Sequence, residues 1–464
     1  MMDYPATDAG QIRTSSHPVR MWLGAPTDMP HPEGMPGKRS TKKVSSSSRM
    51  AWVPPAAVLL GTAWGSNQFT PMLLVYRHTL GLGTGTLEAM FGVYALGLIP
   101  GLLLAGPLSD ARGRRTVVLP AAGLSLAASV VLVAGTHSVA LLFVGRLLTG
   151  VSSGAVFAAG TAWLRETSVP PVGTASRNGA ARRAVIAMTA GFALGPLVAG
   201  MLAQWAPAST IVPYLPHIAL MAGVLISVSK TPETVASGAE RTVRLSVPGV
   251  RSPRFRTVVA PMAPWVFAAP AIAFALLPSV VGAEHVADAI AVAAAVTMLT
   301  AVAGVLIQPL ARRLEAHVAS NRAGVAGLLV LTGGLVLGAA TAQAQQPWLL
   351  VPCAIVLGCA YGLCLVAGLV EVQRIADDDA LAGLTAAYYA LTYLGFAAPY
   401  LLALAAHLAS YPVLLLITAT LALSTAAVVA RRSAQHPETP SQDKWEESWK
   451  GGVPRGSNAG QPPS

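Results

Sequence analysis

Twelve apolar stretches of about 20 residues recur along this chain, and they constrain its fold more than any other feature. A run of that length is what an α-helix needs to cross the hydrocarbon core of a bilayer. Composition agrees, because 53% hydrophobic and 11% charged residues leave too little polar surface to cover a soluble globule of 464 residues. Barrel strands would be shorter and would alternate strictly, so the sequence predicts membrane-spanning helices.

The apolar stretches fall into two groups of six, separated by a polar segment. We predict spans near 52–76, 87–108, 114–136, 138–162, 180–204, 209–229, 257–281, 288–310, 322–341, 347–370, 381–407 and 410–430. The predicted organisation is a disordered cytoplasmic tail at 1–50, an N-terminal six-helix bundle at 51–229, a cytoplasmic linker at 230–256, a C-terminal six-helix bundle at 257–430 and a second disordered tail at 431–464.

Lys and Arg residues are distributed with a strong bias between the two sides of the predicted spans. If the N-terminus is cytoplasmic, 29 of the 31 lie in tails, loops or span ends on that side, and the exceptions are Arg77 and Arg146. The positive-inside rule therefore predicts that both termini are cytoplasmic. We interpret the net charge of +11 as this topological bias, and we expect a lipid bilayer and no nucleic acid as partner.

Short motifs repeat between the two groups of spans. Gly106-Pro107-Leu108-Ser109-Asp110 follows the second span, and Gln308-Pro309-Leu310-Ala311-Arg312 follows the eighth. Similarly, Gly191-Phe192-Ala193-Leu194-Gly195-Pro196 in the fifth span resembles Gly395-Phe396-Ala397-Ala398-Pro399 in the eleventh. A parallel six-plus-six repeat predicts a pseudo-two-fold axis along the membrane normal and a cleft between the halves.

The charged segment 106–115, which we call the clip, is predicted to be a short cytoplasmic turn. It resembles the loop signature of the major facilitator superfamily at Gly106, Asp110, Gly113, Arg114 and Arg115, whereas Ala111 takes the usual first basic position and Arg112 follows one residue late. The resemblance covers about residues 50–431 and implies twelve helices in two bundles that alternate access. Asp110 is expected to accept bonds from basic residues or to lie at a helix N-terminus, and so to hold one conformation. The alternative is a turn with a purely topological role.

Two further motifs resemble the twelve-span drug:proton antiporter branch of that family. Arg146, Gly150 and Gly154 match a pattern of the fourth span, and Gly191, Gly195, Pro196 and Gly200 match a signature of the fifth, although Ala199 and Arg182 stand where glycines are expected. Small residues let helix backbones approach closely, and the proline bends the span. Close packing alone is the alternative explanation for this helix-packing motif.

Proton coupling needs a group that changes its protonation, and no Asp or Glu lies at mid-membrane by these boundaries. Arg146 is the one deep charge, about 12 Å from the outer membrane edge, and is a candidate for coupling or for binding an anionic group, the alternative being structural bonds to backbone carbonyls. The other coupling candidates are Glu88, at the outer start of the second span, and Glu371, at the inner end of the tenth. Glu371 and Arg374 are also spaced to form a helix-end ion pair.

The resemblance implies that spans one, four, seven and ten line the substrate cavity. Their polar and aromatic residues give the cavity candidates Trp64, Asn67, Gln68, Thr149, Trp265 and Tyr361. Such an apolar lining with scattered hydrogen-bonding groups favours an amphipathic, drug-like small molecule. We therefore expect a monomeric secondary transporter of the plasma (inner) membrane that exports such a compound in exchange for protons.

Other classes of function are considered from the same residues. An uptake or facilitated-diffusion permease for a small metabolite, and a transporter-like sensor, remain alternatives. An ATP-driven pump is not expected, because no phosphate-binding loop ending in Gly-Lys-Ser/Thr occurs. His, Cys and carboxylate residues are scattered, so we expect neither an enzyme nor a cofactor or metal site.

Overall fold

The computed structural model describes residues 50–235, 249–282, 288–316, 321–376 and 381–435, all within one compact unit of residues 45–464. The predicted tail at 1–50, apart from Met50, the centre of the predicted linker, and the second tail from residue 436 onward lie outside these ranges. Two boundaries differ from the prediction, because residues 253–256 are already helical and the last helix continues to Gln435.

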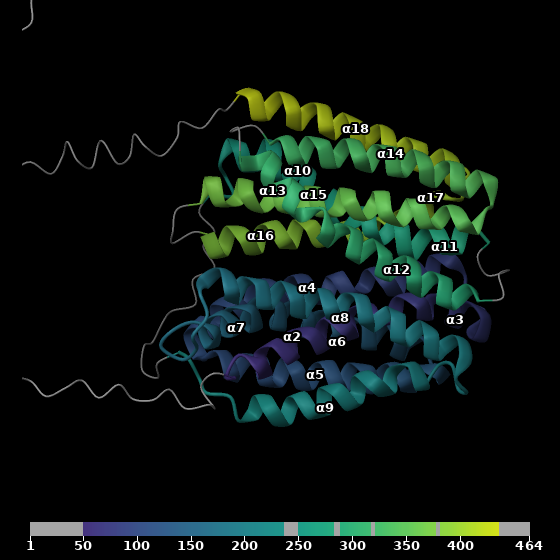
Figure 1. Ribbon diagram of the computed structural model, residues 1–464. Coiled ribbons are helices and arrows are strands. Elements are labelled where there is room, and N and C mark those ends of the chain that lie inside the picture. Colours follow the sequence, from purple (N-terminus) through teal and green to yellow (C-terminus); the bar gives the residue numbers. More distant parts are fainter. Residues whose placement is uncertain (1–49, 236–248, 283–287, 317–320, 377–380, 436–464) are drawn as a thin grey trace, which may run out of the picture. The chain divides into compact units, whose positions relative to one another are not determined.

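The described part of the chain is helical, and its first half contains six spans (Figure 1). The fourth span continues from α6 through a π-helical turn at Val156–Gly160 into α7. The helices of this half are α2 Val53–Asn67, α3 Phe69–Leu80, α4 Thr84–Arg112, α5 Arg114–Ala134, α6 Val139–Ala155, α7 Thr161–Ser168, α8 Arg177–Trp205 and α9 Leu215–Ser229.

The second half contains the other six spans. The seventh span is interrupted by π-helical turns at Phe255–Val259 and Ile272–Leu276, and the eleventh by a 3₁₀ turn at Leu394–Ala397. The helices of this half are α10 Ala260–Ala271, α11 Leu277–Val280, α12 Ala289–Leu306, α13 Gln308–Ala316, α14 Arg322–Ala344, α15 Leu350–Ile375, α16 Leu381–Tyr393, α17 Ala398–Ala405 and α18 Tyr411–Gln435.

Eleven helices among the described residues are long and apolar enough to cross a membrane. The remaining span is the first along the chain. It is formed by α2 and α3 together, with a break at Gln68. The break has a local cause, because Pro71 has no N–H to donate to the carbonyl of Asn67 and its ring crowds that carbonyl. Pro399 stands in the same relation to Gly395, inside the 3₁₀ turn of the eleventh span. The prediction of twelve helices in two bundles is confirmed.

Glycines bring helix backbones into contact in equivalent places in the two halves. A Cβ atom on Gly150 would lie 2.1 Å from the carbonyl oxygen of Tyr94, and one on Gly154 would lie 2.2 Å from that of Leu98, so α6 packs directly on α4. In the second half a Cβ atom on Gly362 would lie 2.1 Å from the carbonyl oxygen of Gly304, which joins α15 to α12 in the same way. These paired contacts express the pseudo-two-fold symmetry.

The remaining residues of the packing motif lie on α8. Cβ atoms on Gly191 and Gly195 would lie 2.2 Å and 2.6 Å from the carbonyl oxygens of Leu60 and Trp64, so these glycines let α8 approach α2. Gly200 instead faces the second half, where a Cβ atom would lie 2.3 Å from that of Ala294 on α12. Pro196 lies inside α8, which remains helical from Arg177 to Trp205.

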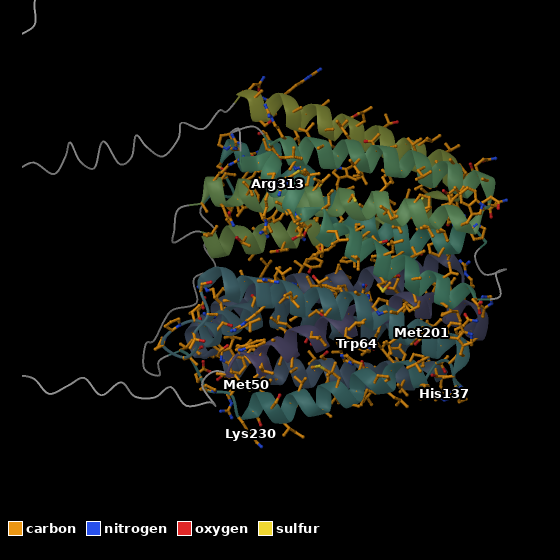
Figure 2. All side chains as sticks on the ribbon, viewed as in Figure 1. Met50, Trp64, His137, Met201, Lys230 and Arg313 are labelled. Carbon is orange, nitrogen blue, oxygen red and sulfur yellow. The ribbon has the colours of Figure 1, made fainter. Side chains whose placement is uncertain are left out.

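The two ends of the helical unit can be told apart. Met50 and Lys230 lie at one end, His137 and Met201 lie at the other, and Trp64 lies between them (Figure 2). We call the first the clip end, because Glu233, three residues after Lys230, accepts from the backbone amides of Arg114 and Arg115, and we call the second the far end. The hydrogen bonds that we describe between the halves lie at the far end: Arg77 Nη1 donates to the carbonyl oxygen of Ser279 at 3.1 Å, and the Ile290 amide donates to Gln204 Oε1 at 3.1 Å.

Candidate functional site

Arg146 is buried in the first half, inside a box of aromatic rings and backbone carbonyls. Its side chain is 1% exposed, and its guanidinium carbon lies 4.6 Å from the ring centre of Phe69 and 4.7 Å from that of Tyr94. The guanidinium donates to the carbonyl oxygens of Ser66 at 3.1 Å and of Met90 and Phe91 at 3.4 Å. Ring faces and carbonyl oxygens stabilise the cation, and these contacts tie α6 to α2 and α4.

A network of hydroxyl groups adjoins this box. Ser66 Oγ and Ser153 Oγ lie 2.7 Å apart, and the hydroxyl of Tyr94 interacts with both serines. The hydroxyls of Tyr76 and Tyr214 form a second pair at 2.8 Å. Buried hydroxyls that satisfy one another in this way fix the rotamers around Arg146.

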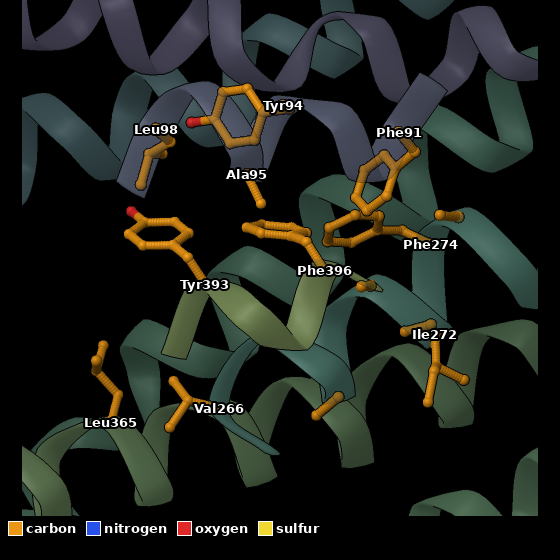
Figure 3. Close-up of a cluster of buried hydrophobic side chains, with 14 of the residues drawn as sticks. Phe91, Tyr94, Ala95, Leu98, Val266, Ile272, Phe274, Leu365, Tyr393 and Phe396 are labelled. Carbon is orange, nitrogen blue, oxygen red and sulfur yellow. The ribbon is translucent and has the colours of Figure 1, made fainter. Parts of the chain in front are cut away.

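Aromatic rings from both halves meet at the centre of the unit (Figure 3). The first half contributes Phe91 and Tyr94 from α4, and the second contributes rings from the seventh, tenth and eleventh spans. Across the halves, the ring centres of Phe91 and Phe396 lie 5.2 Å apart, and those of Tyr94 and Phe396 lie 5.8 Å apart. We call this the central aromatic cluster: Phe91, Tyr94, Phe267, Phe274, Tyr361, Tyr393 and Phe396.

Phe267 is the centre of the cluster on the side of the second half. Its ring stacks on Tyr393 with centres 4.5 Å apart, on Phe396 at 5.1 Å and on Tyr361 at 5.6 Å. The rings fill one another's space in this state, so a bound molecule would have to take the place of part of the stack. Planar, apolar compounds fit such a surface best.

Of the six cavity candidates, the structure places Tyr361 in the central aromatic cluster and directs others elsewhere. Gln68 Nε2 donates to Ser129 Oγ of α5 at 3.0 Å, inside the first half. Trp265 Nε1 donates to Thr425 Oγ1 of α18 at 3.2 Å, away from Phe267. Asn67 Nδ2 donates to the carbonyl oxygen of Phe192 at 3.1 Å.

Thr149 and Trp64 complete the set. The Thr149 hydroxyl donates to the carbonyl of Gly145 in its own helix at 2.7 Å, and Trp64 Nε1 is buried with no hydrogen-bond partner among the described residues. An unpaired buried N–H is a donor that a ligand can satisfy, so Trp64 remains a candidate binding residue.

The clip is mostly helical, which corrects the prediction of a turn at 106–115. Residues 106–112 are the last two turns of α4, α5 begins at Arg114, and only Gly113 between them leaves the helical conformation, with φ at 103°. In a membrane protein, neighbouring helices can satisfy the backbone groups that glycine and proline leave free, so the helix continues through Gly106 and Pro107. Asp110 Oδ1 lies 2.5 Å from Arg114 Nη1, which is the expected bond to a basic residue.

Two glutamates that the sequence did not assign to the clip complete it. Glu166 of α7 accepts from Arg114 Nη2 at 2.8 Å, and Glu233, beyond α9, accepts from the backbone amides of Arg114 and Arg115 at 2.9 Å. Glu233 thereby caps the positive N-terminus of α5. A Cβ atom on Gly113 would lie 2.6 Å from Glu233 Oε2, which together with its positive φ explains the glycine. These partners lie in the first half and in the segment that directly follows α9.

Glu371 lies in a buried ion cluster at the clip end of the second half. It is 0% exposed, and it accepts from Arg254 Nε at 2.6 Å and from Arg374 Nη1 at 2.8 Å. Arg374 also contacts Glu315 at 3.1 Å, and Glu315 accepts from the Ala323 amide at the start of α14. The i,i+3 pair expected from spacing is present, and Arg254 is the partner that spacing alone did not reveal. The cluster joins the seventh, eighth and tenth spans.

Glu88, the coupling candidate at the start of the second span, is a buried residue. Its side chain is 1% exposed, and Oε2 has no hydrogen-bond partner among the described residues. Phe91, three residues later on the same face of α4, packs on Phe274 and Phe396 of the second half, and such long-range contacts leave no signal in the local sequence.

Comparison with known proteins identifies the family. The family model described as Major Facilitator Superfamily matches residues 55–399. The chain belongs to the major facilitator superfamily. The superfamily fold is also evident in solved structures: a POT family transporter in complex with 5-aminolevulinic acid aligns with a TM-score of 0.67 at 12% identity, covering 83% of this chain and 96% of that one. The nucleoside transporter NupG (D323A mutant) aligns with 0.64 at 13%, covering 82% and 98%.

Relatives within the superfamily match a shorter stretch. The multidrug resistance protein MdtL of Escherichia coli O45:K1 is 35% identical over 112 residues, which is 24% of this chain and 28% of that protein. MdtL of Klebsiella pneumoniae is 31% identical over 88 residues, 19% and 22% of the two chains. The chain thus matches about a quarter of the length of these curated relatives. As a superfamily member with eleven apolar helices of spanning length among its described residues, it is a multi-pass membrane protein.

Proposed function

We propose that this transporter exports amphipathic, aromatic compounds in exchange for protons, by alternating access between its two halves. The observation that carries the proposal is the central aromatic cluster, in which rings of both halves converge. Rings in contact across two moving halves offer a surface to planar apolar molecules and separate when the halves part. The matched segment of the MdtL proteins supports the drug-export direction.

Arg146 supports the binding surface from within the first half. It holds the carbonyls of Ser66, Met90 and Phe91, and Phe91 is itself a member of the cluster. A change at Arg146 would therefore displace α4 and the rings that α4 contributes. We assign it the role of coupling the state of the first half to the cluster. We further propose that the protein is a monomer in the inner membrane, with both termini in the cytoplasm.

The test is flux in liposomes that contain the purified protein and carry an imposed pH gradient. Two probes of different charge are used, ethidium, a planar cation, and chloramphenicol, a neutral aromatic amphiphile. We expect the gradient to drive accumulation of at least one of them. Flux that ignores the gradient would remove proton exchange from the proposal, and no flux of either probe would remove aromatic export.

Two variants and a control then locate the binding surface. Phe267→Ala deletes three ring contacts, each worth about 0.5–1.5 kcal/mol, so the KM for the probe should rise roughly tenfold or more. Arg146→Ala should abolish gradient-driven accumulation. Trp348→Ala changes an aromatic side chain that is 67% exposed and outside the cluster, and it should transport like the wild type. An unchanged KM in Phe267→Ala would place the binding site elsewhere.

A further inference from the structure

Glu88 lies on the face of α4 that meets the second half. Phe91 and Gly92, three and four residues later, occupy the same face of the helix. The Phe91 ring lies 5.9 Å from Phe274 and 5.2 Å from Phe396, and a Cβ atom on Gly92 would lie 3.7 Å from the carbonyl oxygen of Phe396. Glu88 is thus a carboxyl group enclosed where the halves touch, one turn nearer the far end than Phe91 of the central aromatic cluster.

Arg77 reaches across the halves beside Glu88. Its Nη1 donates to the carbonyl oxygen of Ser279 on α11 at 3.1 Å, and its Nη2 donates to Thr84 Oγ1 at 2.5 Å. Thr84 lies one helical turn before Glu88 on the same face of α4, which brings the cation close to the carboxyl group. The titratable and charged groups that face Glu88 among the described residues are Arg77 from α3 and Tyr411 from α18.

Further contacts close the far end around this site. The Ile290 amide donates to Gln204 Oε1, and Gly200 of α8 packs on Ala294 of α12. Leu74 of α3 packs with Ala289 and its neighbours at the start of α12. We call these hydrogen-bonding and packing contacts, together with the hydrogen bond from Arg77 to Ser279, the far-side contact. Water at the far end can reach Glu88 only when this contact opens.

We propose that Glu88 takes up the exchanged proton at the far end, and that its protonation decides whether the far-side contact closes. The inference rests on the proposed proton exchange and names the group that performs it. Closing the contact around an ionised carboxylate strips its water and leaves Oε2 without a partner, which costs far more than closing it around the neutral acid.

The proton step balances as a transfer between water and one carboxyl group. With the far end open, the carboxylate of Glu88 takes a proton from a hydronium ion of the far-end water, which leaves the neutral acid and a water molecule. The far-side contact then closes around the neutral acid, and Arg77 donates to the carbonyl oxygen of Ser279. When the halves part at the clip end, the acid gives this proton to water on that side, which leaves a carboxylate and a hydronium ion. The ionised carboxylate then favours opening of the far-side contact, so one proton crosses the membrane in each cycle.

The first test follows the far-side contact directly and needs no substrate. Spin labels are placed at His137 in the first half and at Leu408, 88% exposed, in the second, in a full-length background without the native cysteines. The distance between the labels is measured in reconstituted protein between mildly acidic and mildly alkaline pH. We expect the wild type to shift to longer distances as the pH rises.

Three variants make this test specific. Glu88→Gln, which cannot ionise, should stay at the short distance throughout. Glu88→Asp should keep a pH response, which shows that the site still folds around a shorter acid. Asp288→Asn removes an exposed carboxylate at the same end and should behave like the wild type. A wild type that does not respond, a Glu88→Gln protein that still responds, or loss of the response in Asp288→Asn would each overturn the inference.

The second test separates this inference from the proposed function. Glu88→Gln should lose accumulation of ethidium or chloramphenicol driven by the pH gradient, and it should also lose exchange of the same probe without a gradient, because its far end stays closed. If the wild type shows no gradient-driven flux, the proposed function fails, and the spin-label titration still decides on Glu88. If the wild type transports and Glu88→Gln is equally driven by the gradient, only the role of Glu88 fails.

Discussion

The substitution Gly154→Ala tests whether the contact between α4 and α6 is as tight as the structure indicates. The new Cβ atom would lie 2.2 Å from the carbonyl oxygen of Leu98 and 2.6 Å from the Leu102 amide, whereas ordinary contact begins at 3.4 Å. These are backbone atoms, so no rotamer change relieves the clash and the helices must move apart by more than 1 Å. Arg146 bonds Met90 and Phe91 of α4 at 3.4 Å already, and separation would break both bonds.

The magnitude follows from two opposing terms. Overpacking of a tight interior costs about 1–3 kcal/mol, and a clash with backbone belongs at the upper end of that range. Alanine regains about 1 kcal/mol over glycine in helix propensity. We therefore expect a net loss of about 2 kcal/mol in the free energy of unfolding and a melting temperature lower by a few degrees, roughly 2–4 °C for each kcal/mol.

The assay is the apparent melting temperature of purified protein in detergent, and Gly123→Ala is the matched control. Gly123 is also inside a membrane helix, α5, but a Cβ atom there would meet nothing within 4 Å. It should leave the melting temperature unchanged or slightly higher. Equal melting temperatures for the two variants would refute the close-packing argument.

Three further predictions concern the ends of the unit. Asp110→Asn should slow transport strongly with less than about 1 kcal/mol loss of stability, because Asp110 is 50% exposed and such pairs contribute little; normal flux in this variant would show that the clip has no conformational role. Glu371→Gln should destabilise by about 3–5 kcal/mol, seen as a lower melting temperature or loss of folded protein on size exclusion, because it leaves Arg254 buried beside a neutral group. Single cysteines at Ser138 and Ala344, in a background without native cysteines, should react with impermeant reagents from outside; labelling from the cytoplasmic side would reverse the predicted topology.

Span count and helix packing could be predicted from sequence because their signals are local. The length of an apolar stretch indicates a span whatever that span packs against, and the glycines of the fourth and fifth spans indicate that two helix backbones approach closely. What local signals do not give is the partner. Nothing near Gly150 says that Tyr94 supplies the carbonyl it meets, and nothing near Arg254 points to Glu371, 117 residues away.

The clip was misjudged for a related reason. Glycine, proline and charge together end a helix in water, but Gly106 and Pro107 lie inside α4, whose neighbours satisfy the freed backbone groups. The burial of Glu88 has no local signal either, because Glu88 lies on the face of α4 from which Phe91 contacts the second half. The aromatic residues of α4 and the eleventh span were not singled out either. Phe91 and Tyr94, like Tyr393 and Phe396, are spaced i,i+3, which places a pair on one face without saying what that face meets.

Helix α4 runs from the clip to Glu88, so it links the two ends of the unit. It is continuous for 29 residues, about 43 Å long, with Asp110 at the clip end and Glu88 near the far end. Its middle is held against α6 by Gly150 and Gly154, where the backbones touch and sliding is blocked. A rigid rod held at its centre can still tilt, and a tilt that moves Glu88 away from the second half moves Asp110 in the opposite direction. The clip, whose partners lie in the first half and in the segment directly after α9, and the closed far-side contact are therefore both present in a single orientation of α4.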